Sequence, residues 1–267
     1  MRKASRLQLK NIRRLLKEKK ARDFEGLFVA EGEKMVKDML FKKHLIDSVF
    51  VSASYAGEPG AKEHIDAFEE KGISVYTVGD AEFDKVSSLR HSQSILAVAN
   101  KPCAAVDPFS LGGNAVIVLC DGIQDPGNLG TIIRTSAAMG ADLVMLSGEC
   151  ADICNPKVVR ASSGTILDVP LPECDTGMLD RLKKEGYYLL VSQVSKEKSV
   201  DLAKLKSLPE RIVVAFGSEG QGVAKETLER ANRLFHIPIS EKTESLNVTS
   251  AVAIALYAIR YMLDAKK

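Results

Sequence analysis

The chain has 267 residues, of which 45% are hydrophobic and 27% are charged, a composition typical of a globular protein with one large domain or two ordinary ones. No apolar run reaches the roughly 18 residues that a membrane helix needs, and the basic N-terminus has no apolar stretch behind it, so neither a membrane span nor a secretory signal is predicted. The net charge of +2 is uneven, because residues 1–22 hold ten Lys or Arg and one acid, which leaves −7 for the rest. Such a basic block is typical of a segment that contacts a polyanion.

Residues 5–21 are predicted to form a basic helix, because apolar residues recur there at roughly helical spacing. One face can pack on a domain while the other contacts the phosphates of a polyanion, which gives affinity but little sequence specificity. The cations predicted to make these contacts are Arg13, Arg14, Lys17, Lys19 and Lys20. The alternative is a solvated helix face that binds nothing.

Strands and helices alternate in the segment that follows. A strand, a glycine turn and a helix are predicted within 26–40, then a strand at 46–52, a helix around 61–71, and strands at 74–78 and 95–99. Such alternation indicates a small α/β domain, which is predicted to cover residues 1–105 and carries a net charge of +4. Prolines, glycines and small residues then predict a linker at 106–114.

An α/β pattern restarts at Ala115 and predicts a second domain, residues 115–267. Apolar strands are predicted at 115–120, 143–146 and 187–193, and helices at 128–139 and 179–185. Asp125, Pro126 and Gly127 form a predicted turn before the first of these helices.

The last part of this domain, 211–251, has the most informative pattern. A buried parallel strand at 212–216 is followed by Gly217, Gly220 and Gly222, which let a backbone turn tightly and approach a ligand. A helix at 224–232, a strand at 235–239 and an apolar helix at 248–263 follow. Two strand ends and a helix start therefore meet where open α/β sheets bind ligands. A nucleotide-binding loop is the competing interpretation, but neither a G-x-G-x-x-G after the strand nor a G-x-x-x-x-G-K-[ST] is present.

Several segments resemble the SpoU (TrmH) family of RNA methyltransferases, which belongs to the SPOUT class. GSEGQG, IPIS and ESLNV, in this order, are similar to its second and third motifs, and Asn128 followed six residues later by Arg134 is similar to its first. NPKVVRASSGTILDVP also resembles the family, and LFVAEGEKMVKDML resembles the N-terminal substrate-binding domain of many members. The chain departs from the family pattern at Gln93-Ser94, Ser218 and Thr249-Ser250, which bears on substrate detail.

The resemblance implies a fold and an activity. The fold is α/β, with a small N-terminal RNA-binding domain and a C-terminal parallel-sheet SPOUT domain that contains a deep trefoil knot. The activity is transfer of a methyl group from S-adenosylmethionine to a ribose 2′-hydroxyl of RNA, with no metal ion. The residues that resemble the family's cofactor site are Gly217, Ile237 and Leu246.

The resemblance also implies the catalytic residues, namely Asn128, Arg134, Glu219, Ser245 and Asn247. Arg134 can grip the target phosphate and polarise the 2′-hydroxyl, whereas the pKa of arginine, above about 12, argues against a general base unless a phosphate assists. Glu219 can pair with Arg134 or hold the acceptor. For Ser245 and Asn247 the alternative role is capping of the last helix.

Partners and location complete the expectations. Ribosomal RNA is favoured over transfer RNA because of the added N-terminal domain, and a non-catalytic RNA-binding protein is the rival from another functional class. The helix at 248–263 is apolar on more than one face, which favours a homodimer.

The five cysteines, Cys103, Cys120, Cys150, Cys154 and Cys174, are scattered and odd in number, which predicts reduced thiols in the cytoplasm. Cys150 and Cys154 lack a second pair and a nearby histidine, so no metal site is predicted.

Overall fold

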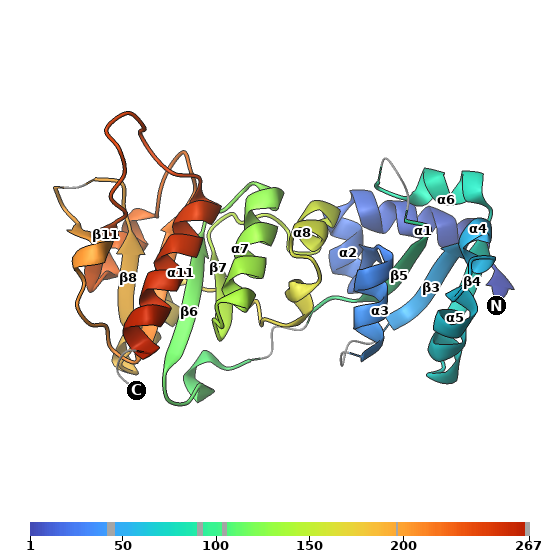
Figure 1. Ribbon diagram of the computed structural model, residues 1–267, viewed down its shortest axis with the longest axis horizontal. Helices are drawn as coiled ribbons and strands as arrows, with labels where there is room; N and C mark the ends of the chain where they lie inside the picture. Colours follow the sequence, from blue (N-terminus) through green and yellow to red (C-terminus); the bar gives the residue numbers. More distant parts are fainter. Residues whose placement is uncertain (42–45, 90–92, 103–105, 196, 265–267) are drawn as a thin grey trace. The chain divides into compact units, whose positions relative to one another are not determined.

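The structure is a computed structural model that describes residues 1–41, 46–89, 93–102, 106–195 and 197–264. The chain forms two compact units (Figure 1). Unit 1 comprises Met1–Pro102 and Asp152–Leu167, and unit 2 comprises Cys103–Ala151 and Asp168–Lys267. Each unit has its own sheet with helices around it, which confirms the predicted α/β class. The predicted domain boundaries stay predictions, and they do not anticipate that Asp152–Leu167 belongs to unit 1.

Unit 1 is built on a five-stranded sheet in the order β1-β4-β3-β5-β2. β1, β4 and β3 are parallel, whereas β5 runs antiparallel to both β3 and β2. The strands are β1 Arg2–Lys3, β2 Leu27–Glu31, β3 Ile46–Ser52, β4 Ser74–Val78 and β5 Ile95–Asn100. The helices are α1 Arg6–Lys17, α2 Lys19–Glu25, α3 Glu33–Phe41, α4 Ala53–Ala56, α5 Ala61–Glu70, α6 Asp80–Val86 and α8 Pro156–Ala161, with the 3-10 turn η2 at Thr165–Leu167.

Residues 5–21 form two helices rather than the single helix predicted. The break is at Glu18, whose backbone is extended (φ −115°, ψ 113°), so that α1 ends before it and α2 begins after it. Apolar spacing did not reveal this break because Ala21 is buried on the core side, like Leu9, Ile12 and Leu15 of α1. The residue that follows, Arg22, faces the interior.

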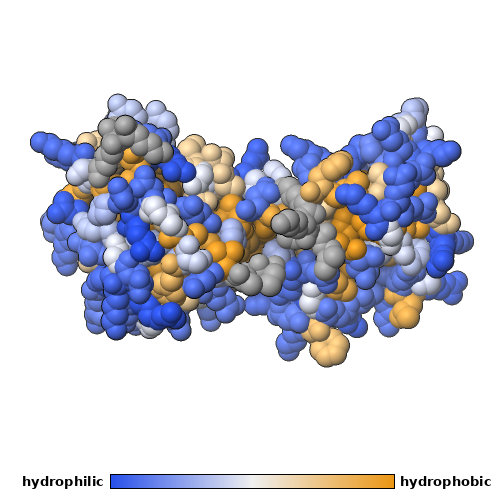
Figure 2. Space-filling view, turned by 90° about the horizontal axis from the view of Figure 1, so that it is seen from below, coloured by the Kyte–Doolittle hydropathy of each residue, from blue (hydrophilic) through white to orange (hydrophobic). Residues whose placement is uncertain are grey.

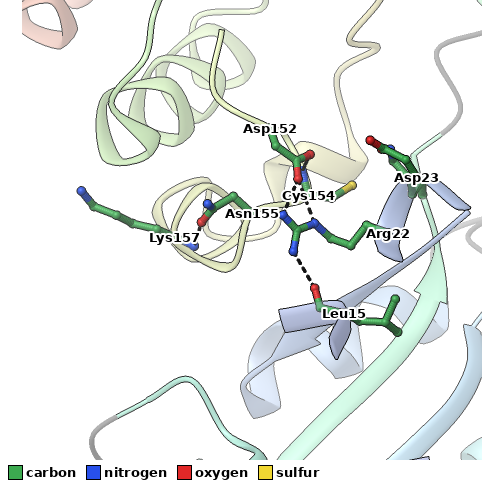
Figure 3. Close-up of polar contacts among 8 residues, drawn as sticks. Leu15, Arg22, Asp23, Asp152, Cys154, Asn155 and Lys157 are labelled. Atoms are coloured by element: carbon green, nitrogen blue, oxygen red, sulfur yellow. Dashed lines mark hydrogen bonds and ion pairs between the residues drawn. The ribbon is translucent and has the colours of Figure 1, made fainter. Parts of the chain in front are cut away.

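Arg22 joins α2 to the segment Asp152–Leu167 within unit 1 (Figure 3). Its Nε and Nη2 atoms donate to Oδ2 of Asp152 at 2.8 and 2.6 Å, and its Nη1 donates to the carbonyl oxygen of Leu15 at 2.6 Å. The side chains of Arg22 and Asp152 are 3% and 9% exposed. The other carboxylate oxygen of Asp152 accepts from the amide of Cys154 at 3.0 Å. The buried guanidinium of Arg22 thus donates from all three of its nitrogens, and it fixes the start of this segment.

Unit 2 contains a six-stranded, all-parallel sheet in the order β7-β6-β10-β8-β11-β9. The strands are β6 Ala115–Asp121, β7 Leu143–Ser147, β8 Tyr188–Ser192, β9 Val200–Asp201, β10 Arg211–Gly217 and β11 Arg233–His236. The helices are α7 Pro126–Ala138, α9 Thr176–Lys184, α10 Lys225–Arg230 and α11 Val248–Asp264, with 3-10 turns η1 Pro108–Ser110 and η3 Leu202–Lys204. α7 packs against α11 (Figure 1). The parallel sheet of the predicted SPOUT domain is thus confirmed, while the trefoil knot stays a prediction.

Two local differences from the predicted elements have simple causes. α7 starts at Pro126, inside the predicted turn, because Asp125 caps the helix by accepting from the amide of Asn128 at 2.8 Å and proline suits the first helical position. The strands β1 and β9 were not predicted, because two residues carry no periodicity.

The exposed surface is mostly hydrophilic on the face seen in Figure 2, with hydrophobic residues in separate patches. Within the residues that the structure describes, every helix is too short or too polar to cross a membrane.

Candidate active site

A cavity of about 660 Å³ opens at the carboxyl ends of β10 and β11 in unit 2. All three residues predicted to bind the cofactor, Gly217, Ile237 and Leu246, line it. Phe216 and Val248 add further apolar lining. The volume is that of a site for a nucleoside-sized ligand, and its place at the strand ends of a parallel sheet is where such ligands bind.

The glycine loop, residues 217–223, forms one wall of this cavity. The loop folds back on itself, since the amide of Gly222 donates to the carbonyl oxygen of Ser218 at 2.9 Å. A Cβ atom on Gly217 would lie 2.0 Å from the carbonyl carbon of Gly222 and 2.2 Å from the nitrogen of Val223. Gly222 has a φ of 71°, which favours glycine. The tight backbone turn expected from the sequence is therefore present, and Gly217 has no room for any side chain.

Three predicted catalytic residues meet beside the loop, and we call them the Asn–Glu–Asn cluster: Asn128 of α7, Glu219 of the glycine loop and Asn247 before α11. Oε1 of Glu219 accepts from Nδ2 of Asn247 at 2.7 Å and from Nδ2 of Asn128 at 3.1 Å. The two asparagines also touch, with Nδ2 of Asn247 at 3.4 Å from Oδ1 of Asn128. Residues 119 positions apart in sequence thus share one carboxylate.

A second cavity of about 290 Å³ also borders the cluster. Asn128 lines this smaller cavity, together with Gln124 and Asp125, and Glu219 lines both cavities. The smaller cavity has the polar side chains of Gln124, Asp125 and Asn128 beside apolar Ile123 and Val248. The Glu219 side chain therefore borders the space for a cofactor in one cavity and the space for a polar acceptor in the other.

Asn247 has two roles at once. Its Oδ1 accepts from the amide of Thr249 at 2.8 Å and from the hydroxyl of Thr249, so it caps α11. Its Nδ2 is directed to Glu219. The capping role that the sequence offered as an alternative is thus present together with the position in the cluster, and the cap fixes which way the amide group points.

The two remaining predicted catalytic residues are Ser245 and Arg134. Ser245 is exposed and lines the larger cavity. Arg134 is exposed on α7, and the residues that line the two cavities do not include it. Since Arg134 is six residues beyond Asn128, the two side chains project from different faces of α7.

The cysteine thiols are free at Cys120, Cys150, Cys154 and Cys174, while Cys103 lies outside the described residues. Burial raises the pKa of Cys154 and of Cys174 to about 12, so both remain protonated at neutral pH. Among the residues that the structure describes, no three His, Cys, Asp or Glu side chains are grouped as metal ligands would be.

The basic helix of unit 1 carries its charges on a face opposite the core. Four exposed cations recur at helical spacing along α1 and form what we call the basic row: Arg6, Lys10, Arg13 and Lys17. The sequence prediction omitted Arg6 and Lys10, although their spacing of four, seven and eleven residues could have revealed them. Arg14 is instead ion-paired with Glu25, and Lys19 and Lys20 are exposed at the start of α2.

Two known protein families match this chain, one over each unit. The model of the SpoU rRNA Methylase family matches residues 115–257, which contain the whole Asn–Glu–Asn cluster. This chain belongs to the SpoU rRNA methylase family. A second family model, the MRM3-like substrate binding domain, matches residues 7–97. The resemblance suggested by the sequence motifs is thereby confirmed for the second unit, and the substrate-binding likeness extends over the first.

Relatives of the SpoU family align over most of this chain. The 23S rRNA (guanosine(2553)-2'-O)-methyltransferase RlmP of Bacillus subtilis (strain 168) is 30% identical over 245 residues, covering 91% of this chain and 92% of that protein. The 23S rRNA (adenosine(1067)-2'-O)-methyltransferase of Streptomyces laurentii is 30% identical and covers 72% of this chain and 71% of its own. The crystal structure of an AdoMet-bound rRNA methyltransferase from Sinorhizobium meliloti has a TM-score of 0.85 at 27% identity, covering 98% of this chain and 97% of its own.

Proposed function

We propose that this protein transfers a methyl group from S-adenosylmethionine to a ribose 2′-hydroxyl of ribosomal RNA. This proposal rests on the position of Glu219, whose side chain lines both cavities and accepts hydrogen bonds from two asparagine side chains. A carboxylate at that position lies beside the cofactor cavity and can also contact an acceptor hydroxyl. The 23S rRNA 2'-O-methyltransferase names of two relatives, from Bacillus subtilis and Streptomyces laurentii, support the reaction type and the RNA.

The larger cavity fits S-adenosylmethionine. Apolar side chains of Ile237 and Leu246 suit an adenine ring, and Gly217 leaves its backbone open to close approach. When bound, the cofactor supplies a methyl group on a positively charged sulfonium, so the donor needs no metal for its activation. The cofactor was found bound in the Sinorhizobium meliloti structure, to which this chain is similar.

The chain's own residues have to prepare the acceptor. A ribose hydroxyl is a poor nucleophile until its proton is lost, so the site must align it and assist proton loss. Asn128 and Asn247 hold the Glu219 carboxylate in one orientation, from which it can accept a hydrogen bond from the hydroxyl. Ser245 adds a small polar group in the same cavity wall. The role of Arg134 is to grip the phosphate next to the target ribose with its planar fork.

RNA is held mainly by unit 1. The basic row of α1, with Lys19 and Lys20, supplies exposed cations for phosphate contacts. The likeness of residues 7–97 to the MRM3-like substrate binding domain supports this division of labour, in which unit 1 binds RNA and unit 2 carries the chemistry. Arg14, which was included among the RNA contacts on sequence grounds, is the weaker candidate because Glu25 already pairs with it.

Ribosomal RNA is favoured over transfer RNA because both relatives named above are 23S rRNA enzymes that align over more than two thirds of this chain. Such a substrate also supports a cytoplasmic location, which cell fractionation tests: recovery of the protein outside the cytosolic and ribosomal fractions contradicts it.

A homodimer is supported by α11. Ile254, Tyr257 and Tyr261 are exposed large hydrophobic residues on this helix, and a groove of about 500 Å³ beside them is lined by Leu202, Leu205 and others. Their spacing of three and four residues puts them on one helix face, and a second copy of the chain is the partner that would cover it. Sedimentation at micromolar concentration should give a dimer, and Tyr257→Glu with Tyr261→Glu should give a monomer. A monomeric wild-type protein contradicts the assembly.

Cofactor binding separates the proposed enzyme from a non-catalytic RNA-binding protein. Calorimetry of the purified protein with S-adenosylmethionine should give one site per chain at micromolar affinity or better. Glycine at position 217 is required for that site, because a Cβ would collide with Gly222 and Val223, so Gly217→Ala should abolish binding. Gly112→Ala is the control, because Gly112 also belongs to unit 2 and has no positive φ, but lies outside the cavity lining and has open space for a Cβ. No binding by the wild-type protein favours the RNA-binding rival.

A further inference from the structure

A buried carboxylate lies at the base of the glycine loop, outside the lining of both cavities. Asp121 is the last residue of β6 and is 4% exposed. Its Oδ2 accepts two hydrogen bonds, from the amide of Ala224 at 3.0 Å and from Oγ1 of Thr227 at 2.9 Å. Thr227 is 2% exposed. Neither residue is among the predicted site residues, and the chemistry described above does not use them.

These contacts tie down both ends of the glycine loop. At its start, Gly217 of β10 is in parallel register with Asp121. At its end, Val223 is followed directly by Ala224, whose amide the Asp121 carboxylate accepts. The end of β6 therefore contacts the chain just before the loop and just after it, once by strand pairing and once by the side chain.

The loop between these two points carries the site. Residues 217–223 line the larger cavity, and Glu219 belongs to the Asn–Glu–Asn cluster. The loop is short and closed by its own hydrogen bond from Gly222 to Ser218, so a shift at its end moves Glu219 and the cavity wall together. The backbones of Gly217 and Gly222 are packed so closely that not even a Cβ fits between them, so a shift of the loop would change the shape of the cavity wall.

We infer that Asp121 and Thr227 are positioning residues, which set the place of the glycine loop against the cofactor cavity. The inference rests on the proposed function, because it takes the larger cavity to be the site for S-adenosylmethionine. Loss of the Thr227 hydroxyl removes one of the two donors to Asp121, and loss of the carboxylate leaves two buried donors unsatisfied; either change loosens the end of the loop. Cofactor affinity falls as a result, although neither side chain touches the cofactor.

The test compares pairs of variants that differ in one hydrogen bond. Thr227→Val removes the hydroxyl at nearly constant volume, and Thr227→Ser restores it. Asp121→Ala removes the acceptor, and Asp121→Asn keeps an oxygen that can receive both donors. The matched control is Asp142→Ala: Oδ2 of Asp142 accepts the amide of Val116 at 2.8 Å, at the opposite end of the same strand β6. Each full-length protein is titrated with S-adenosylmethionine by calorimetry, and its thermal midpoint is measured without ligand.

We expect substitutions at the Asp121 end of β6 to weaken cofactor binding, and the substitution at the Val116 end to leave it unchanged. Thr227→Val should raise the Kd for S-adenosylmethionine about tenfold, the worth of one lost hydrogen bond, and Asp121→Ala, which loses two, should raise the Kd at least as much. Thr227→Ser and Asp121→Asn should stay within about threefold of wild type, and Asp142→Ala should lower the midpoint without changing the Kd. The double variant should bind no more weakly than the worse single one, since both act through one contact.

Two outcomes overturn the inference in different ways. If Thr227→Val lowers the thermal midpoint but binds the cofactor like wild type, the pair serves stability alone and the positioning role is wrong. If the wild-type protein does not bind S-adenosylmethionine, the proposed function is wrong and the inference falls with it. Should Asp121→Ala fail to fold, the Thr227 pair decides the matter by itself.

Discussion

Arg134→Ala should lower kcat by roughly two to three orders of magnitude, the loss seen when one preorganised donor to a developing charge is removed. The reason is that a guanidinium that grips the phosphate beside the target ribose acts mainly in the transition state. Cofactor binding should barely change, because Arg134 does not line the larger cavity. Arg134→Lys should not rescue turnover, since a point charge cannot replace a planar fork. The measurement is single-turnover methyl transfer at saturating RNA.

Substitutions in the basic row should have the opposite effect, on RNA binding instead of turnover. Replacing Arg6, Lys10, Arg13 and Lys17 together by glutamine should weaken RNA binding and flatten its salt dependence, because fewer counterions are released on binding. Turnover at saturating RNA should stay close to wild type. If Arg134→Ala also turns over normally once RNA saturates, Arg134 is another phosphate contact and its catalytic role is wrong.

Removal of one partner of the buried Arg22–Asp152 pair should strongly destabilise unit 1. Arg22→Ala leaves a carboxylate that is 9% exposed without its counter-charge, and breaking a buried pair in this way costs about 3–5 kcal/mol. That is a large share of the stability of an ordinary domain, about 5–15 kcal/mol. The loss should appear in urea unfolding followed by a probe in unit 1.

Further substitutions at the same two positions distinguish the ion pair from general packing. Asp152→Asn should cost less than Arg22→Ala because it retains an acceptor, and Arg22→Met with Asp152→Leu should recover part of the loss. Lys225→Ala, which breaks the exposed pair with Glu229 on α10, should change nothing measurable. A loss below about 1 kcal/mol for Arg22→Ala contradicts the account of this anchor.

Regular elements with strong apolar patterns could be predicted from the sequence. β3 at Ile46–Ser52 and β4 at Ser74–Val78 agree with their predicted bounds, because β-branched and apolar residues there are flanked by polar turns. α11 was predicted to within one residue for the same kind of reason. The break at Glu18 could not be, since the apolar spacing continues through it.

Contacts between residues far apart in the sequence could not be predicted from its pattern. Asp152–Leu167 lies between two strands of unit 2 in sequence, yet it belongs to unit 1, where Asp152 makes a buried contact with Arg22, 130 residues away. Asp121 and Thr227 likewise are 106 residues apart and share no motif. A periodicity argument detects neighbours along one element, not partners brought together by tertiary folding.

The candidate site was found by resemblance rather than by pattern. Asn128, Glu219 and Asn247 were named because their motifs resemble the SpoU family, and the structure brings the three side chains together. Gly217 could be argued from physics, as a strand end that needs close backbone approach. Arg134 was named on the same resemblance, but its exposed place on α7 could not be foreseen from a six-residue spacing alone.

The central claim is that this chain methylates a ribose 2′-hydroxyl of ribosomal RNA, and mapping of 2′-O-methyl positions tests it most directly. Ribosomal and transfer RNA from a strain without this protein, and from the same strain carrying the wild-type or the Arg134→Ala form, are compared for ribose methylation at every nucleotide. The account predicts that one ribosomal site is unmethylated in the deletion strain, restored by the wild-type protein and not by Arg134→Ala. An unchanged ribosomal profile, with or without a lost site in transfer RNA, contradicts it.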